Sequence, residues 1–242
     1  MRQVIRCASI LALSACVSTV WAAPRDPADP WESFNRGVFR FNETADRYVA
    51  KPLAKTYQAV TPVFIDDSIT RVFNNLATPI TIVNQLLQGK LHDAAGQTAR
   101  FMFNSTVGIA GIFDIAARMD LPRQQEDFGQ TLAVWGARPG PYLMLPLLGP
   151  STVRDAGGRV IDMGTDPRSH ANKTARFVMT ATDVTDTRAD LLAAEKVIEG
   201  DRYLFIRDYF LQQRAFVIAD GVVTKDEFLD DAIENDAATG SF

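Results

Sequence analysis

The sequence predicts an all-α fold made of many short helices. Apolar residues recur at steps of three and four along most of the chain, and no segment alternates convincingly as a strand would. Proline and glycine interrupt these patterns at short intervals. Between Arg138 and Arg154 the chain has no charge and four prolines, which rule out a helix there. We therefore expect short helices around one Pro/Gly-rich, non-helical segment.

The first residues are predicted to be a lipoprotein signal peptide. Arg2 and Arg6 precede an apolar run, and Leu-Ser-Ala-Cys at residues 13–16 resembles the bacterial lipobox, whose cysteine receives lipid. We expect a leader at residues 1–15 and lipidation of Cys16. Cleavage at an ordinary small-residue site after Ala22 is the alternative, and the leader itself does not decide between them.

Residues 16–28 are then a short tether to the folded part. Val17 follows the cysteine, where an aspartate is associated with retention at the inner membrane. The sequence therefore favours an outer-membrane lipoprotein.

Composition excludes several classes of function. The chain has 25 Lys and Arg against 29 Asp and Glu, so a nucleic-acid-binding surface is not expected. Only two cysteines occur, and Cys7 lies in the leader, so no disulfide framework is expected. We find no HExxH, CxxC, GxSxG or Walker A motif, and expect no metal, cofactor or catalytic residue. Ser169 beside His170 keeps a hydrolase formally open, although a lone loop histidine is usually a surface residue.

The first helix should begin at Asp29-Pro30. Asp29 suits the N-cap, Pro30 the first helical position, and Glu32 a capping box. Its apolar stripe consists of Trp31, Phe34, Val38, Phe41, Ala45 and Tyr48. Such a stripe fits either a buried core face or a helix at a membrane interface.

Further prolines are expected to divide the next helices. Pro52 and Pro62 should break the chain before a second helix over residues 65–76, and Thr78-Pro79 should start a third that ends before Gly89. Residues 72–89 carry no charge but are too polar for a transmembrane span, which needs about 20 mainly apolar residues.

A fourth helix is expected over residues 91–104, followed by a tight turn at Gly108 and Gly111. A short helical turn to Met119 and a polar loop then lead to the Pro/Gly-rich segment. Residues 142–148 of that segment could form a hairpin. The segment is either a buried connection or irregular backbone that protein shields at membrane depth.

The C-terminal part is again predicted to be helical. A helix after Ser151 should be interrupted at Gly157-Gly158, and further helices are expected around residues 176–182, 191–198 and 203–217. Residues 221–242 form an acidic tail.

The chain resembles the MlaA (VacJ) family of outer-membrane lipoproteins, which help to maintain lipid asymmetry. The residues that carry the resemblance are Asp29-Pro30, Phe34-Asn35-Arg36, Phe41-Asn42, Asn74-Asn75-Leu76 with Pro79, Asn84, Leu87-Gln88-Gly89, Arg100-Phe101 with Asn104, Gly108, Gly111, Asp114, Asp127-Phe128-Gly129, Thr131-Leu132, Gly140-Pro141-Tyr142, Leu145-Pro146, Gly149, and Arg154-Asp155 with Gly157. They define a helical domain at residues 29–220.

The resemblance implies a ring of amphipathic helices lying in the inner leaflet of the outer membrane around an off-centre channel. Phospholipid misplaced in the outer leaflet would enter the channel and pass to a periplasmic carrier of the MlaC type, and the protein would associate with a trimeric porin. No enzymatic step is implied. The alternative is a structural envelope lipoprotein that scaffolds porins.

The resemblance also assigns roles to residues. The membrane-facing residues would be Trp31, Phe34, Phe101, Phe103, Ile109, Ile112 and Phe113. Arg154, Asp155 and Asp162 would line the headgroup path, with a helix-capping ion pair as the alternative. Arg40 and Phe41 match the gating segment, although Arg40 stands where the family leads us to expect asparagine.

Overall fold

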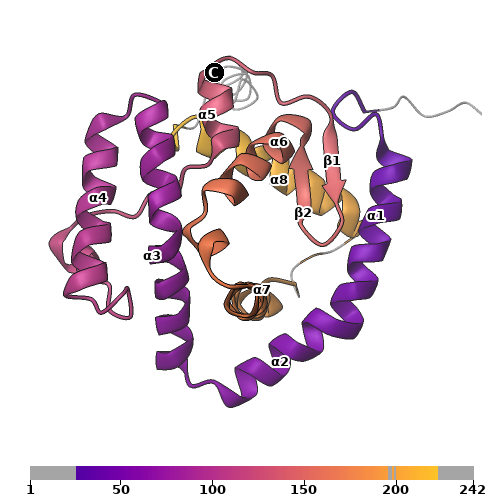
Figure 1. Cartoon of the computed structure of the whole chain (residues 1–242). Helices are drawn as coiled ribbons and strands as arrows, with labels where there is room; N and C mark the ends of the chain where they lie inside the picture. The colour runs from indigo at the N-terminus through magenta and orange to yellow at the C-terminus, as the bar shows by residue number, and fades with distance from the viewer. Residues whose placement is uncertain (1–25, 196–197, 199, 223–242) are drawn as a thin grey trace, which may run out of the picture.

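The computed structural model describes residues 26–195, 198 and 200–222 (Figure 1). The predicted leader at 1–15, the lipidation site Cys16, most of the tether at 16–28 and most of the acidic tail lie outside these residues and remain predictions.

The described chain is mostly helical and is arranged as a ring, as predicted. Its elements are α1 (Glu32–Ala45), the π-helical turn η1 (Asp46–Ala50), α2 (Lys51–Val60), α3 (Val63–Leu87), α4 (Leu91–Thr106), the 3-10 turn η2 (Ala116–Met119), α5 (Phe128–Val134), β1 (Tyr142–Leu145), β2 (Gly149–Thr152), α6 (Val153–Thr165), the 3-10 turn η3 (Pro167–His170), α7 (Lys173–Ala194) and α8 (Arg202–Ile218). In Figure 1, α1, α2 and α3 form a curved wall, with α6, α7 and the hairpin inside it.

Two of the three predicted proline breaks are wrong. Pro52 lies in the first turn of α2, which continues from α1 through η1. The N–H of Lys51 bonds to the carbonyl of Asp46, five residues back, and this widened turn accommodates the proline ring. Pro79 lies inside α3, which does not end there. Only Pro62 separates helices, as the N-cap residue of α3.

The helix α3 continues through Pro79 because tertiary hydrogen bonds stabilise the helix on both sides of the proline. Asn75 Nδ2 donates to Ser105 Oγ of α4 at 2.9 Å, and Thr131 Oγ1 of α5 donates to Asn84 Oδ1 at 2.8 Å. An interior proline costs about 3 kcal/mol, which a few buried hydrogen bonds of about 1 kcal/mol each offset together with packing. The polar residues that punctuate this uncharged stretch are therefore structural.

The prediction that Asp29 caps the first helix is also wrong. The N-cap residue of α1 is Trp31, and no side chain caps the helix. Asp29 is completely buried and accepts hydrogen bonds from Asn35 Nδ2 at 2.8 Å and from the hydroxyl of Tyr203 in α8. It joins the first and last described helices instead of capping one of them.

The Pro/Gly-rich segment contains the hairpin that the sequence allowed. Strands β1 and β2 pair antiparallel with Tyr142 opposite Thr152, so the hairpin extends further than residues 142–148. Tyr142 and Met144 are buried beside Tyr203 in a small hydrophobic core, whereas Leu147 at the turn is exposed. One face of the hairpin is thus buried, and the turn at its tip is apolar and exposed.

Two asparagines of α1 hold the free edge of β1. Asn35 donates to the Tyr142 carbonyl at 3.1 Å and accepts from the Met144 N–H at 2.9 Å. One heptad further, Asn42 donates to the Leu145 carbonyl at 2.9 Å and accepts from the Leu147 N–H at 2.8 Å. Because an amide carries both a donor and an acceptor, each side chain satisfies a strand edge as a neighbouring strand would.

The C-terminal helices are longer than predicted. The helix α6 runs through Gly157 and Gly158 without interruption. The helix α7 covers the segment expected around 176–182 and continues to Ala194, into the start of the one expected around 191–198, because its polar middle is bonded to other elements. Asp186 accepts from Tyr57 and Thr70, and Arg188 pairs with Asp46 at 2.6 Å.

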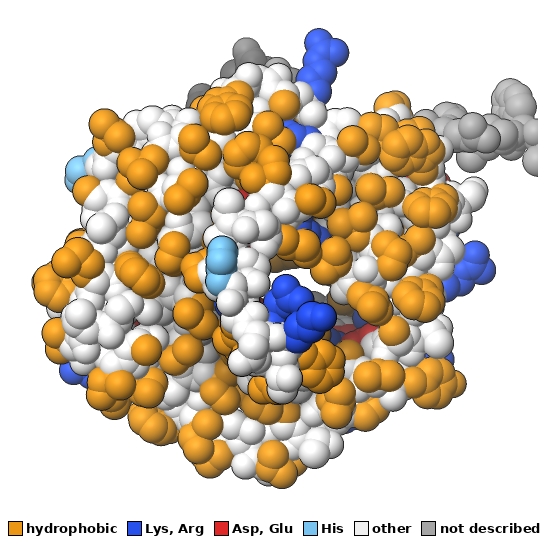
Figure 2. Space-filling view, in the orientation of Figure 1, with side chains coloured by type: hydrophobic (Ala, Val, Ile, Leu, Met, Phe, Trp, Pro, Cys, Tyr) orange, Lys and Arg blue, Asp and Glu red, His pale blue; other side chains and the backbone are white. Residues whose placement is uncertain are grey.

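The distribution of polarity is inverted relative to an ordinary globular domain. Among the described residues, polar and charged side chains outnumber hydrophobic ones in the buried set, and many large hydrophobic side chains are exposed. Figure 2 shows hydrophobic side chains spread over most of the visible face. Across the described part of the chain, no helix is long and apolar enough to cross a membrane.

Candidate functional site

The apolar stripe of α1 faces outward. Trp31, Phe34, Phe41 and Tyr48 are exposed, with Phe34 retaining 59% of its surface. Val38 alone of the large apolar stripe residues packs partly against the hydrophobic core. Of the two interpretations left open, the core face is therefore wrong for most of the stripe.

The other residues predicted to face a membrane lie on α4 and the loop after it. Phe103, Ile109 and Phe113 are exposed, whereas Phe101 and Ile112 are half-buried. Gly108 closes this loop as expected, because a Cβ there would lie 2.3 Å from the Phe113 carbonyl oxygen. Most of the predicted set is therefore exposed.

Arg154 and Asp155 are buried at the start of α6. Asp155 Oδ1 accepts from Arg154 Nε at 2.9 Å, and its Oδ2 accepts from the hydroxyl of Thr152 at 2.9 Å. Thr152 is the N-cap residue of α6 and accepts from the Asp155 N–H at 3.2 Å. These contacts form the helix-capping ion pair that the sequence left as the alternative for this pair.

Asp162 lies two turns further along α6 and has a different environment. Its carboxylate accepts from the Phe128 N–H at 2.9 Å and from Asn84 Nδ2 at 3.1 Å. Burial raises the pKa of this carboxyl, and the two hydrogen bonds only partly oppose the shift. Asp162 therefore receives donors from α3 and α5 but makes no ion pair among the described residues.

A cavity of about 180 Å³ joins Asp155 and Asp162. It is lined by Asp127, Asp155, Arg159, Asp162, Phe210 and Arg214. Arg214 of α8 makes a bidentate pair with Asp127, both contacts at 2.6 Å, and reaches Asp155 at 3.0 Å. Burial alone would lower the pKa of this guanidinium, but its hydrogen bonds to Asp127 raise it above the ordinary value. No local sequence pattern marks Arg214, because its partners Asp127 and Asp155 lie more than fifty residues away.

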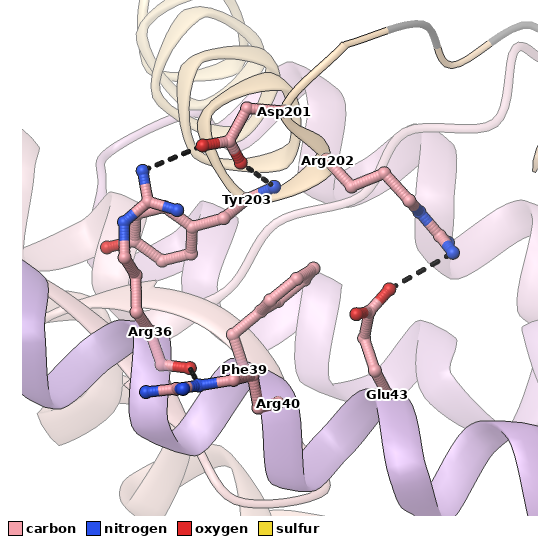
Figure 3. Close-up of a pocket in the computed structure, with 7 residues that line it drawn as sticks. All are labelled: Arg36, Phe39, Arg40, Glu43, Asp201, Arg202 and Tyr203. Carbon is pink, nitrogen blue, oxygen red and sulfur yellow. Dashed lines mark hydrogen bonds and ion pairs between the residues drawn. The ribbon is translucent and has the colours of Figure 1, made fainter.

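A larger cavity of about 380 Å³ lies between α1 and the start of α8. It is lined by Arg36, Phe39, Arg40, Glu43, Asp201, Arg202 and Tyr203 (Figure 3). The four residues from α1 follow steps of three and four, which marks a second helix face beside the apolar stripe. That periodicity was visible in the sequence, but the opposing residues from α8 were not.

Two ion pairs frame this cavity. Arg36 pairs with Asp201 at 2.9 Å and stacks over the Tyr203 ring at 4.5 Å, while Arg202 pairs with Glu43 at 3.1 Å. The hydrogen bond from Arg36 holds the pKa of the Asp201 carboxyl below its ordinary value. Figure 3 shows Phe39 between these two pairs.

The predicted gating residues point to different sides of α1. Arg40 lines the larger cavity, whereas the Phe41 side chain is exposed with the apolar stripe. In Figure 2 basic side chains lie at a hollow near the centre of the visible face, within the mainly hydrophobic surface. The molecule thus combines an apolar exterior with charged cavities inside the ring.

The serine and histidine that kept a hydrolase open lie at η3. Ser169 Oγ lies 3.2 Å from Nδ1 of the adjacent His170, and within the described residues no carboxylate pairs with this histidine. The same residues contain no cluster of three or more His, Cys, Asp or Glu side chains that could hold a metal ion.

The comparisons with known proteins agree with this architecture. Residues 27–217 match the family model described as MlaA lipoprotein. The intermembrane phospholipid transport system lipoprotein MlaA of Escherichia coli is 29% identical over 206 residues, covering 83% of this chain and 82% of that protein. An uncharacterised protein of Rickettsia felis is 41% identical over 133 residues, so the aligned part spans about half of that relative, 53%.

One solved structure has a closely similar fold. It is described as "Structural basis for maintenance of bacterial outer membrane lipid asymmetry" and superposes with a TM-score of 0.71 at 30% identity. The match covers 78% of this chain and 98% of that one.

Proposed function

Because the chain belongs to the MlaA lipoprotein family, we propose that it is the lipoprotein component of an intermembrane phospholipid transport system that maintains outer-membrane lipid asymmetry. We further propose that the protein removes misplaced phospholipid from the outer leaflet through a channel within the helical ring. It carries out no covalent chemistry in this scheme.

The observation that carries the proposal is the inverted distribution of polarity. Exposed aromatic and aliphatic side chains on α1, α3 and α4 would cost free energy in water, whereas acyl chains would solvate them. We propose that this belt, including Trp31, Phe34, Phe101, Phe103, Ile109, Ile112 and Phe113, lies in the inner leaflet of the outer membrane. Lipidation of Cys16 would add a covalent anchor to this contact.

The charged cavities supply the polar part of the proposed path. A phospholipid headgroup leaving one leaflet needs polar partners while its acyl chains keep apolar contact. We propose that Asp155 and Asp162 contribute to the wall of this path and that Arg154 holds Asp155 in place. Arg40 and Phe41 would form the gating segment, with one residue in the cavity and the other in the apolar belt.

Partners complete the proposed route. Phospholipid would pass from the channel to a periplasmic carrier of the MlaC type, and a trimeric porin would hold the protein at the outer membrane.

The test measures phospholipid exposed in the outer leaflet of cells that lack this protein, with and without a wild-type copy. Exposure should rise on loss and return to normal on complementation. A Cys16→Ser copy should complement poorly, and full complementation would favour cleavage after Ala22.

Two further readouts separate the alternatives. Purified protein should carry bound phospholipid, which a porin scaffold has no reason to do. A phospholipase would release fatty acid and lose that activity in Ser169→Ala, whereas we expect no turnover in either form.

A further inference from the structure

We propose that the cavity between α1 and α8 is a binding subsite for the phosphodiester of a phospholipid headgroup, with Arg40 as its contacting cation. This inference rests on the proposed function and adds the ligand chemistry of one site. At about 380 Å³ the cavity lies at the small end of the range of about 300–1,000 Å³ for ligand sites.

The charges in the cavity are unevenly paired. Arg36 is engaged twice, with Glu32 at 2.7 Å and with Asp201 at 2.9 Å. Arg202 is also engaged twice, with Glu43 at 3.1 Å and with Glu195 at 3.5 Å. Both carboxylates that line the cavity are therefore taken by these two arginines.

Arg40 is the exception. Its Nε donates to the carbonyl of Arg36 on its own helix at 3.3 Å, and it makes no ion pair among the described residues. A guanidinium carries five N–H donors in a planar fork, so four of them face solvent or the cavity. This fork matches the geometry of phosphate oxygens and can bind two of them at once.

Arg202 lines the other side of the cavity and is held there by its ion pairs. Its Nε is buried and has no hydrogen-bond partner among the described residues, so it is not exposed to the cavity and the ligand contact is left to Arg40. Figure 3 shows Arg40 on α1, bonded to the Arg36 carbonyl, and Arg202 at the start of α8, paired with Glu43.

The walls favour a lipid over free phosphate. Phe39 and Tyr203 line the cavity and lie edge to face with ring centroids 5.6 Å apart. The Tyr203 ring is buried, stacked under Arg36 and bonded through its hydroxyl to Asp29, so the half-buried Phe39 supplies the accessible apolar surface. A cation beside an aromatic wall suits a phosphate joined to a glycerol and acyl chain.

The experiment compares the full chain in detergent micelles with two single variants. Arg40→Asn removes the proposed contact, and Arg47→Asn is the matched control, an exposed arginine one heptad further along the same helical run and outside the cavity. The probes are dihexanoylphosphatidylglycerol, inorganic phosphate and the uncharged dihexanoylglycerol.

Arg40→Asn should weaken binding of the short phospholipid about tenfold, as expected for one charge-assisted contact, and leave dihexanoylglycerol unaffected. Arg47→Asn should bind like the wild type. Equal binding by all three proteins, or equal weakening in both variants, would overturn the subsite and leave the proposed function standing. Inorganic phosphate binding as tightly as the lipid would overturn the lipid assignment. Wild-type protein that binds no phospholipid would overturn the subsite and the proposed function together.

Discussion

Gly158 of α6 lies against Gly129 of α5 at backbone contact, so that a Cβ on Gly158 would come within 2.4 Å of the Gly129 nitrogen. Gly129 in turn faces the charged cluster, since a Cβ there would lie 2.5 Å from Arg214 Nη2 and 2.6 Å from Asp155 Oδ1. The two glycines therefore allow α5, α6 and α8 to meet around one set of ion pairs.

Gly158→Ala should destabilise the protein by about 1–3 kcal/mol, because backbone atoms at 2.4 Å cannot yield without separating α5 from α6. Gly157→Ala is the matched control, since a Cβ there meets nothing within 4 Å. The control should be neutral or more stable by up to about 1 kcal/mol, as alanine favours a helix. Thermal unfolding in detergent measures both, and equal stability of the two variants would contradict the proposed contact.

Asn35→Ala should be among the most destabilising substitutions on α1. It leaves the Met144 N–H and the Tyr142 carbonyl without a buried partner, at about 1–3 kcal/mol for each unsatisfied group, and removes one of the two donors to the Asp29 carboxylate. Ser33→Ala on the same helix removes an exposed hydroxyl and should change stability by less than about 0.5 kcal/mol. Denaturant unfolding distinguishes them, and similar midpoints would show that the strand edge does not depend on Asn35.

Asp186 should make stability depend on pH. Burial raises the pKa of its carboxyl, and the neighbouring Asp66 adds to the shift by repulsion and a shared hydrogen bond. Because the pKa of Asp186 is higher in the folded than in the unfolded protein, the protonated carboxyl stabilises the fold. This stabilisation is complete below the unfolded-state pKa near 3.8 and is lost as pH rises through the folded-state pKa. Asp186→Asn imitates the protonated form.

The free energy of unfolding of Asp186→Asn should therefore increase relative to that of the wild type as pH rises from about 4 to 8. Asp120→Asn, an exposed residue whose left-handed backbone also suits asparagine, should follow the wild type across the same range. A constant difference between Asp186→Asn and wild type would show that the carboxyl does not titrate in this window.

Asp155→Lys should unfold or strongly destabilise the protein. From the sequence alone we would expect this change to impair transport in a folded protein, but Asp155 is buried between two arginines. A third cation there leaves unpaired buried charge, at about 3–5 kcal/mol. Asp67→Lys breaks only a half-exposed pair with Arg71 and should cost at most about 1 kcal/mol. Retention of native circular dichroism and unfolding temperature in Asp155→Lys would refute the predicted destabilisation.

Trp31 should report on the proposed membrane contact. With Trp21 and Trp135 changed to Phe, the exposed Trp31 remains as the fluorophore. Its fluorescence should be quenched in vesicles of brominated phospholipid and not in the same vesicles without bromine. No difference between the two would place the first helix outside the lipid.

Much of the helical fold could be predicted from the sequence because the signals are local. The stripe of α1, the boundary at Pro62, the turn at Gly108 and the hairpin after Tyr142 all depend on residues a few positions apart. Most of the predicted membrane-facing residues are exposed, with Trp31 and Phe34 at the start of α1, Phe103 on α4, and Ile109 and Phe113 in the turn after α4.

Tertiary contacts decided what local rules could not. Pro79 lies within a helix because distant partners of α3, Ser105 among them, supply hydrogen bonds that outweigh the local preference for a break. Asp29 does not cap α1, because it is bonded to the distant Tyr203. The cavity joins Arg40 to Arg202 only because the ring brings α1 and α8 together. Periodicity determines which side of a helix is polar, but the partner of a buried polar group is chosen by the packing of the whole chain.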